Sequence, residues 1–447
     1  MAEPRDLTLY RAGEEMRRGN LTAVALVESC LERIRAREET VRAWANLYAD
    51  EALQTARRRD REAARHHWHG PLHGLPVGMK DIYDVRGQST EAGTEAYPPR
   101  IADRDADSVA RLREAGAIIL GKTVTTAFAM GDAGKTRNPW NPAHTPGGSS
   151  SGSGAAVADR MCLAALGTQT NGSVIRPAAF NGLVGFKPGL GEISTAGVIP
   201  LSWQLDHVGC LVRSVEDAHL LWHLLRDRRM LDWQATRDKM PPALLPRAPQ
   251  RVWRLRESFE DEADPEMRAM FDAFCQRLVE RGVTIIERKL PASFAGMHEA
   301  HHAIMSSEAA TVHRAAFEAD PTPFPPKISG LIREGLELKA TDYVAALRHR
   351  LRLIAQMKSA LADVDAAVSP AAVGPAPEGL QSTGSPMFST LASICGLPAV
   401  AVPAGLSGGG LPLGVQLMGD NGGEDDLLSV AGWCESLLVF QAAPDER

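Results

Sequence analysis

Hydrophobic side chains recur at two different spacings in the first half of the chain. Val24, Val27 and Leu31 are three or four residues apart, which predicts a helix over 22–35 with one buried face. Residues 76–225 instead alternate short apolar runs with helical segments. Such alternation is typical of a sheet whose two faces are covered by helices, so the pattern predicts an α/β fold.

The second half begins with a polar, proline-rich stretch at 226–252, which separates the predicted sheet from a more variable helical region. The clearest helical patterns in that region cover 297–317 and 341–362. The chain then closes with strands expected near 364–369, 399–402 and 413–418, followed by a final helix from Asp425. No internal repeat accompanies this order.

Composition narrows the classes of protein that fit. The 447 residues are 44% hydrophobic, which supplies a sizeable core, and 49 basic against 55 acidic side chains leave a net charge of −6. This balance argues against an extended nucleic-acid-binding surface. The N-terminus lacks the apolar core of a signal peptide, and no apolar run reaches membrane-spanning length. We therefore expect a cytoplasmic protein without nucleic-acid or membrane partners.

The residues that most often bind metals form no ligand pattern in the sequence. Six cysteines are scattered without a Cys-x-x-Cys pair, which favours reduced thiols over a disulfide framework or a zinc site. Four histidines, His298, His301, His302 and His313, share a helical face in the variable region. Without matching acidic or cysteine ligands, they fit pocket lining or core packing better than a metal site.

Two serine-bearing, glycine-rich turns lie close together in the chain. The first reads Gly-Gly-Ser-Ser-Ser-Gly-Ser-Gly at 147–154, and the second reads Thr-Asn-Gly-Ser-Val-Ile-Arg-Pro at 170–177. A serine hydroxyl needs a base to become a good nucleophile, and glycines let backbone NH groups approach a substrate oxygen closely. The pair of turns therefore indicates an active site that contains Ser149 and Ser173.

Lys80 is the candidate base. It follows an apolar stretch, Gly-Leu-Pro-Val-Gly-Met, that predicts a short buried strand. Desolvation lowers the pKa of a buried lysine by up to a few units, which leaves a neutral amine able to accept a serine proton. Taken singly, a lysine beside Asp81 is more often a surface residue, and a Gly/Ser loop is more often a flexible connection.

These elements together resemble the amidase signature family, which combines a lysine before an aspartate, a Gly-Gly-Ser-Ser loop and a downstream Gly-Ser. Their joint occurrence in the family's order outweighs the simpler interpretation of each. Further matching segments lie at 121–123, 138–142, 182–188, 205–209, 396–400 and 411–416, so the resemblance covers most of the chain and is weakest between about 225 and 360.

The resemblance implies one domain over residues 1–447, with a central, mostly parallel or mixed β-sheet covered by helices on both faces. The catalytic core would span about 70–225. A variable, substrate-side helical region would span about 226–362, and closing strands with a last helix would span 363–447.

The resemblance also implies a role for each site residue. Lys80 would be the base, Ser149 a bridging serine after a cis Gly148–Ser149 peptide bond, and Ser173 the nucleophile that forms an acyl-enzyme. Backbone NH groups of Thr170, Asn171, Gly172 and Ser173 would form the oxyanion hole, with no metal and no cofactor. Asn171 stands where relatives usually have Gly or Ala, so its amide is expected to influence which substrate fits.

The sequence around the second turn most resembles the malonamidase-type branch of the family. Gln169 stands where most relatives carry Asp, and Arg176 lies three residues after Ser173 rather than two. In that branch the arginine binds the free carboxylate of the substrate, a task that suits a planar bidentate guanidinium. The alternative is a structural Arg176 that holds a buried carboxylate or carbonyl groups.

Two other segments match the motifs of phosphate-binding proteins and α/β-hydrolases, but their surroundings do not fit those folds. Residues 116–123 satisfy the P-loop spacing, but the four apolar residues inside the motif predict a buried strand after the helix 108–115. Residues 148–152 match the Gly-x-Ser-x-Gly pattern of a nucleophile elbow, but the segment before them is turn-like rather than a strand.

The sequence thus predicts an enzyme that hydrolyses a small acyl amide, such as the carboxylate-bearing malonamate, and releases ammonia. One alternative is the glutaminase subunit of a tRNA-dependent amidotransferase, which would need partner chains. Another is a catalytically silent binding or scaffold protein. The expected partner is a small-molecule amide, and the chain could also form a homodimer.

Overall fold

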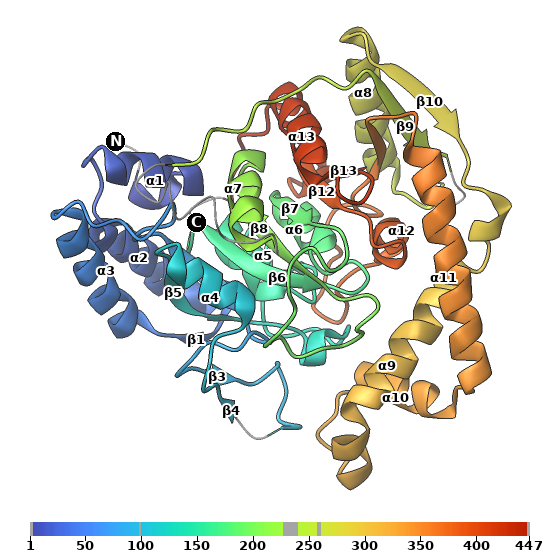
Figure 1. Ribbon diagram of the computed structural model, residues 1–447, viewed down its shortest axis with the longest axis horizontal. Coiled ribbons are helices and arrows are strands. Elements are labelled where there is room, and N and C mark those ends of the chain that lie inside the picture. Colours follow the sequence, from blue (N-terminus) through green and yellow to red (C-terminus); the bar gives the residue numbers. More distant parts are fainter. Residues whose placement is uncertain (1–2, 98–99, 227–239, 257–260, 445–447) are drawn as a thin grey trace.

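The computed structural model describes residues 3–97, 100–226, 240–256 and 261–444. Within them, a single large sheet of eleven strands runs through the molecule (Figure 1). From one edge to the other its strands are β1 (Trp44–Leu47), β5 (Ile118–Thr123), β2 (Pro76–Lys80), β6 (Ala164–Gln169), β8 (His207–Val212), β7 (Val184–Lys187), β12 (Ala399–Leu406), β13 (Pro412–Met418), β11 (Ala366–Pro370), β9 (Arg251–Leu255) and β10 (Thr284–Arg288). A separate two-stranded sheet pairs β3 (Ser89–Thr90) with β4 (Arg100–Ile101).

The pairing direction changes along the large sheet. Strand β2 is parallel to both β5 and β6, and β9 is parallel to both β10 and β11. The strands between these groups pair antiparallel. Because β2 and β6 are parallel neighbours, their carboxyl ends meet at one edge of the sheet, where Lys80 and Gln169 lie.

Helices cover this mixed sheet on both faces, which confirms the predicted α/β class (Figure 1). They are α1 (Leu9–Arg17), α2 (Ala23–Val41), α3 (Ala49–Ala63), α4 (Asp107–Glu114), α5 (Ser151–Ala158), α6 (Ile175–Asn181), α7 (Val215–Leu225), α8 (Pro265–Glu280), α9 (Met297–Ala319), α10 (Pro326–Glu337), α11 (Ala340–Leu361), α12 (Met387–Ile394) and α13 (Glu424–Leu438). Short 3-10 turns occur at Pro4–Asp6, Ala127–Ala129 and Ala292–Phe294.

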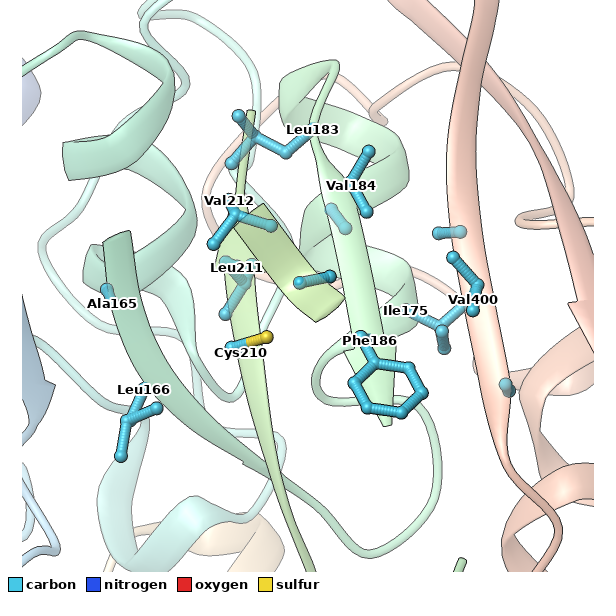
Figure 2. Packing of buried hydrophobic residues seen from close by; sticks show 14 of the residues in the cluster. Ala165, Leu166, Ile175, Leu183, Val184, Phe186, Cys210, Leu211, Val212 and Val400 are labelled. Carbon is cyan, nitrogen blue, oxygen red and sulfur yellow. The ribbon is translucent and has the colours of Figure 1, made fainter. Parts of the chain in front are cut away.

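The core is continuous across the middle of the sheet. Figure 2 shows Leu166 of β6, Cys210 of β8, Phe186 of β7 and Val400 of β12 side by side, and each is at most 2% exposed. Every residue of β6 and β8 is buried, as expected where helices cover both faces of a sheet.

Helices α9, α10 and α11 form a helical arm at one side of the molecule (Figure 1). Helices α10 and α11 both pack against α9, and α9 also contacts α12. Helices were expected at 297–317 and 341–362, and α9 and α11 fill these positions. The division into three segments stays a prediction, and residues 227–239 at the first boundary lie outside the described part of the chain.

The P-loop match forms no phosphate-binding loop. Its residues run from the end of α4 into the buried strand β5, as the apolar interior predicted. The lysine of the motif, Lys122, is fully buried, and its Nζ lies 2.8 Å from Asp81 Oδ1 and 2.8 Å from the carbonyl oxygen of Ser89. Lys122 therefore ties two chain segments together.

All six cysteines are buried free thiols. Among the helices of the described residues, none combines the length and the apolar character needed to span a bilayer.

Candidate active site

Lys80 ends strand β2 in the large sheet and is completely buried. Its Nζ donates hydrogen bonds to Ser149 Oγ at 2.8 Å and to Thr168 Oγ1 at 2.7 Å. Burial lowers the pKa of this lysine to about 7, while the negative charge of Asp206 acts in the opposite direction. A substantial fraction of Lys80 is therefore neutral at neutral pH and able to accept a proton.

Ser149 lies in a loop that is held rigidly from both sides. Two neighbouring side chains bond back to the backbone, Ser151 Oγ to the carbonyl of Gly147 at 2.9 Å and Ser150 Oγ to the carbonyl of Thr168 at 3.3 Å. The Gly148–Ser149 peptide bond is cis, as the family resemblance implied. The loop is part of the packed scaffold, which excludes the flexible-connection alternative.

A glycine is required where this loop enters helix α5. A Cβ atom on Gly152 would lie 2.2 Å from the carbonyl oxygen of Ala43 and 2.4 Å from the amide nitrogen of Val124. Only a residue without a side chain lets the helix start this close to its neighbours. The glycines of the motif thus bring Ser149 against strand β2.

Ser173 lies in the nucleophile turn, residues 170–173, which connects β6 to α6. Within the described residues, neither the Ser173 hydroxyl nor the backbone NH groups of Asn171, Gly172 and Ser173 bond to another protein group. Free NH groups beside a free hydroxyl are what an oxyanion hole requires. The hydrogen bond from Ser173 to Ser149 that a proton relay would use is not formed in this structure.

Gln169 fixes the far end of the nucleophile turn. Its Oε1 accepts hydrogen bonds from the backbone NH groups of Val174 at 2.9 Å and Ile175 at 3.0 Å, which start helix α6. Its Nε2 donates to Ser393 Oγ at 3.1 Å, and Ser393 in turn donates to the carbonyl of Asn171. Gln169 therefore acts as the N-terminal cap of α6 and links the turn to α12.

Thr170 is held by two residues, the half-buried Asp206 and the buried His301, that the sequence analysis did not single out for this role. Its hydroxyl donates to Asp206 Oδ1 at 2.6 Å, and its carbonyl oxygen lies 3.0 Å from His301 Nε2. Asp206 also accepts from the backbone NH groups of Leu201 and Ser202 at 2.8 and 3.0 Å. The nucleophile turn is thus fastened both to the 201–206 loop and to the helical arm.

A second residue of α9 anchors the 201–206 loop. Glu308 is 3% exposed, and its Oε2 accepts from Ser202 Oγ at 2.6 Å and from the backbone NH of Gln204 at 3.0 Å. Its other oxygen accepts from the Tyr343 hydroxyl of α11 at 2.6 Å. His301 and Glu308 together bind the arm to the elements around Ser173.

Arg176 is buried on helix α6 and contacts backbone carbonyl groups. Its two terminal nitrogens donate to the carbonyl oxygens of Gly148 at 2.6 Å and Gly384 at 2.8 Å, while its Nε has no partner within the described residues. Burial lowers the pKa of its guanidinium to about 10, which leaves it charged at neutral pH. Arg176 therefore supports the peptide bond that precedes Ser149.

A cavity of about 510 Å³ opens beside the buried lysine and the nucleophile turn. Its polar lining includes Thr168, Thr170 and Asp206, and its apolar lining includes Ile82 and Trp203, which is 56% exposed. A second hollow of about 600 Å³ is lined by Asn171 and by residues of α9. Asn171 is oriented there by Thr390, whose hydroxyl donates to the Asn171 side-chain oxygen at 2.8 Å.

The four histidines of α9 serve as core and pocket lining, as predicted. His301 and His313 are buried, and His313 Nδ1 lies 2.9 Å from the Tyr97 hydroxyl. His298 and His302 line the hollow beside Asn171. Burial lowers the pKa of both His301 and His313 to about 4, so these two are neutral at neutral pH.

A buried lysine that is hydrogen-bonded to a serine can activate a hydroxyl for acyl transfer. Comparisons with known proteins narrow this class. The Amidase family model matches residues 25–428, so the chain belongs to the amidase family and is an amide-hydrolysing enzyme.

Individual relatives span nearly the whole chain. The amidase of Pseudomonas putida is 33% identical over 425 residues, which cover 91% of this chain and 90% of the relative. A relative from Koribacter versatilis (strain Ellin345), one of the subunits of a glutamyl-tRNA(Gln) amidotransferase, is 31% identical over 461 residues, which cover 94% and 95%. A crystal structure of an amidase matches with a TM-score of 0.87 and 33% identity, covering 97% of this chain and all of that one.

Proposed function

We propose that Lys80, Ser149 and Ser173 form the catalytic triad of this amidase, with Ser173 as nucleophile. The observation that carries the proposal is the 2.8 Å hydrogen bond between Ser149 and a fully buried lysine whose pKa lies near 7. As Ser173 Oγ attacks the amide carbonyl carbon, its proton passes to Ser149, and the proton of Ser149 passes to neutral Lys80.

The backbone NH groups of residues 170–173 would then stabilise the negative oxygen of the tetrahedral intermediate. Collapse of the intermediate breaks the C–N bond, and the proton returns through Ser149 to the leaving nitrogen, which departs as ammonia from a primary amide. A water molecule hydrolyses the acyl-enzyme by the same relay, which releases the carboxylic acid and restores Ser173.

The cavity beside Thr168 and Thr170 fits the role of substrate pocket, because it borders both the lysine's partner and the nucleophile turn. Its size and largely apolar lining suit a small acyl amide. A substrate with a carboxylate, such as malonamate, would rely on Arg176, whose terminal nitrogens bind the Gly148 and Gly384 carbonyls. These two contacts use two of the five N–H donors of the guanidinium, so the carboxylate preference stays a prediction.

The triad can be tested by single substitutions in the full chain, with ammonia release from a panel of small amides as the readout. Ser173→Ala should abolish turnover, and Ser149→Ala and Lys80→Ala should each slow it about 10²–10⁴-fold with the circular dichroism spectrum unchanged. Ser359→Ala is the control, because it removes the hydroxyl of an exposed serine on α11 that bonds to the carbonyl of Ala355. Full activity in Ser173→Ala would refute the assignment.

The similarity to amidotransferase subunits keeps a second function open, that of a glutaminase subunit. The two functions differ in what the isolated chain can do. A free-standing amidase hydrolyses small amides alone, whereas a subunit would release ammonia from glutamine efficiently only with its partner chains. Turnover of a small amide by the purified chain at kcat values typical of enzymes, about 1 per second or more, would rule out the subunit. The homodimer and the cytoplasmic location likewise stay predictions.

A further inference from the structure

Helices α7 and α13 pack antiparallel, apart from the helical arm (Figure 1). At one end of the pair, the backbone NH of Val215 donates to the Glu435 carboxylate at 3.1 Å. At the other end, His219 and His223 of α7 face Asp425 in the first turn of α13. This second group takes no part in the amide hydrolysis described above.

The two histidines are four residues apart on one helix, so their rings project from the same face. Their Nε2 atoms lie 2.9 Å from each other, and His223 Nε2 lies 3.3 Å from Asp425 Oδ1. All three atoms lie within 4.8 Å of one another. A tetrahedral Zn²⁺ with bonds of about 2.0–2.1 Å separates its ligand atoms by about 3.3 Å, so little movement would bring the three atoms around one ion.

Hydrogen bonds do not account for both contacts of His223 Nε2. A single proton between the two imidazoles can form the hydrogen bond from one Nε2 to the other, but the same proton cannot also form a bond to Asp425. A divalent cation, in contrast, accepts a lone pair from all three atoms at once.

The surroundings hold the carboxylate in place. The indole NH of Trp222 donates to Asp425 Oδ1 at 2.9 Å, and Arg226 lies 3.3 Å from Oδ2. Outer contacts of this kind orient the ligands of metal sites. Because the three side chains are partly or fully exposed, a water molecule can complete a tetrahedral set.

From this geometry we propose that His219, His223 and Asp425 form a transition-metal site, with Zn²⁺ as the fitting ion, that fastens the last helix to α7. Two imidazoles and one carboxylate are a common zinc ligand set. The metal would complement the Val215–Glu435 contact, so both ends of the helix pair would be tied. The expectation of no metal came from the family resemblance, the scattered cysteines and the four histidines at 298–313, none of which involves α7 and α13.

The test uses the full chain without a polyhistidine tag, freed of metal by a chelator and titrated with Zn²⁺ in a calorimeter. We expect one Zn²⁺ per chain and a rise in Tm on addition of the metal. Co²⁺ should give the visible absorption of a tetrahedral complex. In His219→Gln/His223→Gln the affinity should fall at least about tenfold and the rise in Tm should vanish.

Two controls separate this site from general surface binding. His298→Gln/His302→Gln removes the same number of histidines from α9, and Asp426→Asn removes the exposed acid next to Asp425; both should bind Zn²⁺ like the parent. Ammonia release from an amide substrate confirms that each variant is folded. Saturable one-to-one binding that survives in His219→Gln/His223→Gln, or its absence in the parent, would overturn the proposal.

Discussion

His301 Nε2 lies 3.0 Å from the carbonyl oxygen of Thr170, although the two residues are 131 positions apart in the chain. A carbonyl oxygen can only accept, so the proton of the neutral ring must reside on Nε2. The contact joins the helical arm to the nucleophile turn three residues before Ser173. We interpret His301 as a positioning residue that holds the turn rather than as a group that reacts.

The first prediction concerns this contact. Replacing His301 by Ala should lower kcat about 10- to 100-fold with a much smaller change in KM, because the turn loses its support while the cavity keeps its shape. His301→Gln offers an amide NH to the same carbonyl and should recover part of the loss. His302→Ala, at the exposed neighbour on α9, is the control. Equal kinetics for His301→Ala and His302→Ala would show that the contact has no catalytic importance.

The second prediction concerns pH. The ammonium form of Lys80 has no lone pair, so only the neutral amine can accept the proton of Ser149. With a pKa lowered to about 7 by burial, kcat/KM should rise as pH increases through about 7 and level off above it. His301, with a pKa of about 4, does not titrate in this range. A pH profile that is flat between about pH 6 and 8.5 would contradict a lysine base.

The burial of Lys80 also affects the stability of the folded chain. Between the folded pKa of about 7 and the ordinary value of 10.5, the unfolded chain binds a proton at Lys80 that the folded chain does not. Folding is therefore penalised most below pH 7, and the penalty shrinks as pH rises towards 10.5. Lys80→Met removes the penalty, so Tm at neutral pH should stay equal or rise while turnover is lost, as calorimetry can measure. A clear fall in Tm would contradict this account.

The three residues of the proposed triad can be picked out from sequence because each sits in a short local motif. Lys80 ends a buried strand, and Ser149 and Ser173 lie in glycine-rich turns. The bonds between these motifs depend on β2 and β6 being parallel neighbours, which a pattern of apolar runs does not specify. The candidate residues therefore come from the sequence, whereas the contacts between them come from the fold.

The residues that hold the nucleophile turn were harder to predict. His301 and Glu308 lie on a helix that periodicity predicted correctly, but which face of α9 meets Thr170 and Ser202 is decided by tertiary packing. Gln169 was recognised as a departure from most relatives, yet its capping of α6 follows only from the geometry of the turn. The pairing of α7 with α13 also depends on tertiary packing and could not be predicted from the sequence, because His223 and Asp425 are 202 positions apart in the chain.

The fourth prediction tests Gln169. In Gln169→Ala the buried NH groups of Val174 and Ile175 lose their acceptor, which should lower the free energy of unfolding by about 1–3 kcal/mol. kcat should fall with it, because the turn is released at its far end. Ser393→Ala removes only the link to α12. Its free energy of unfolding, measured by urea denaturation, should therefore fall less than that of Gln169→Ala. Unchanged stability in Gln169→Ala would mean that water replaces the lost acceptor.

The last prediction decides between two roles for Arg176. If the guanidinium holds a substrate carboxylate, Arg176→Ala should lower kcat/KM for malonamate at least about tenfold, the value of a charge-assisted bidentate bond, and should affect the matching neutral amide much less. If Arg176 instead supports the loop, both substrates should lose activity equally, because the carbonyls of Gly148 and Gly384 lose their donor in either case.

Arg176→Lys sharpens the comparison, since a lysine keeps the charge but cannot reach both carbonyls in the same plane. The ratio of the two kcat/KM values in the parent and in each variant, with Tm as a check on folding, separates the roles. An unchanged ratio would exclude the carboxylate preference.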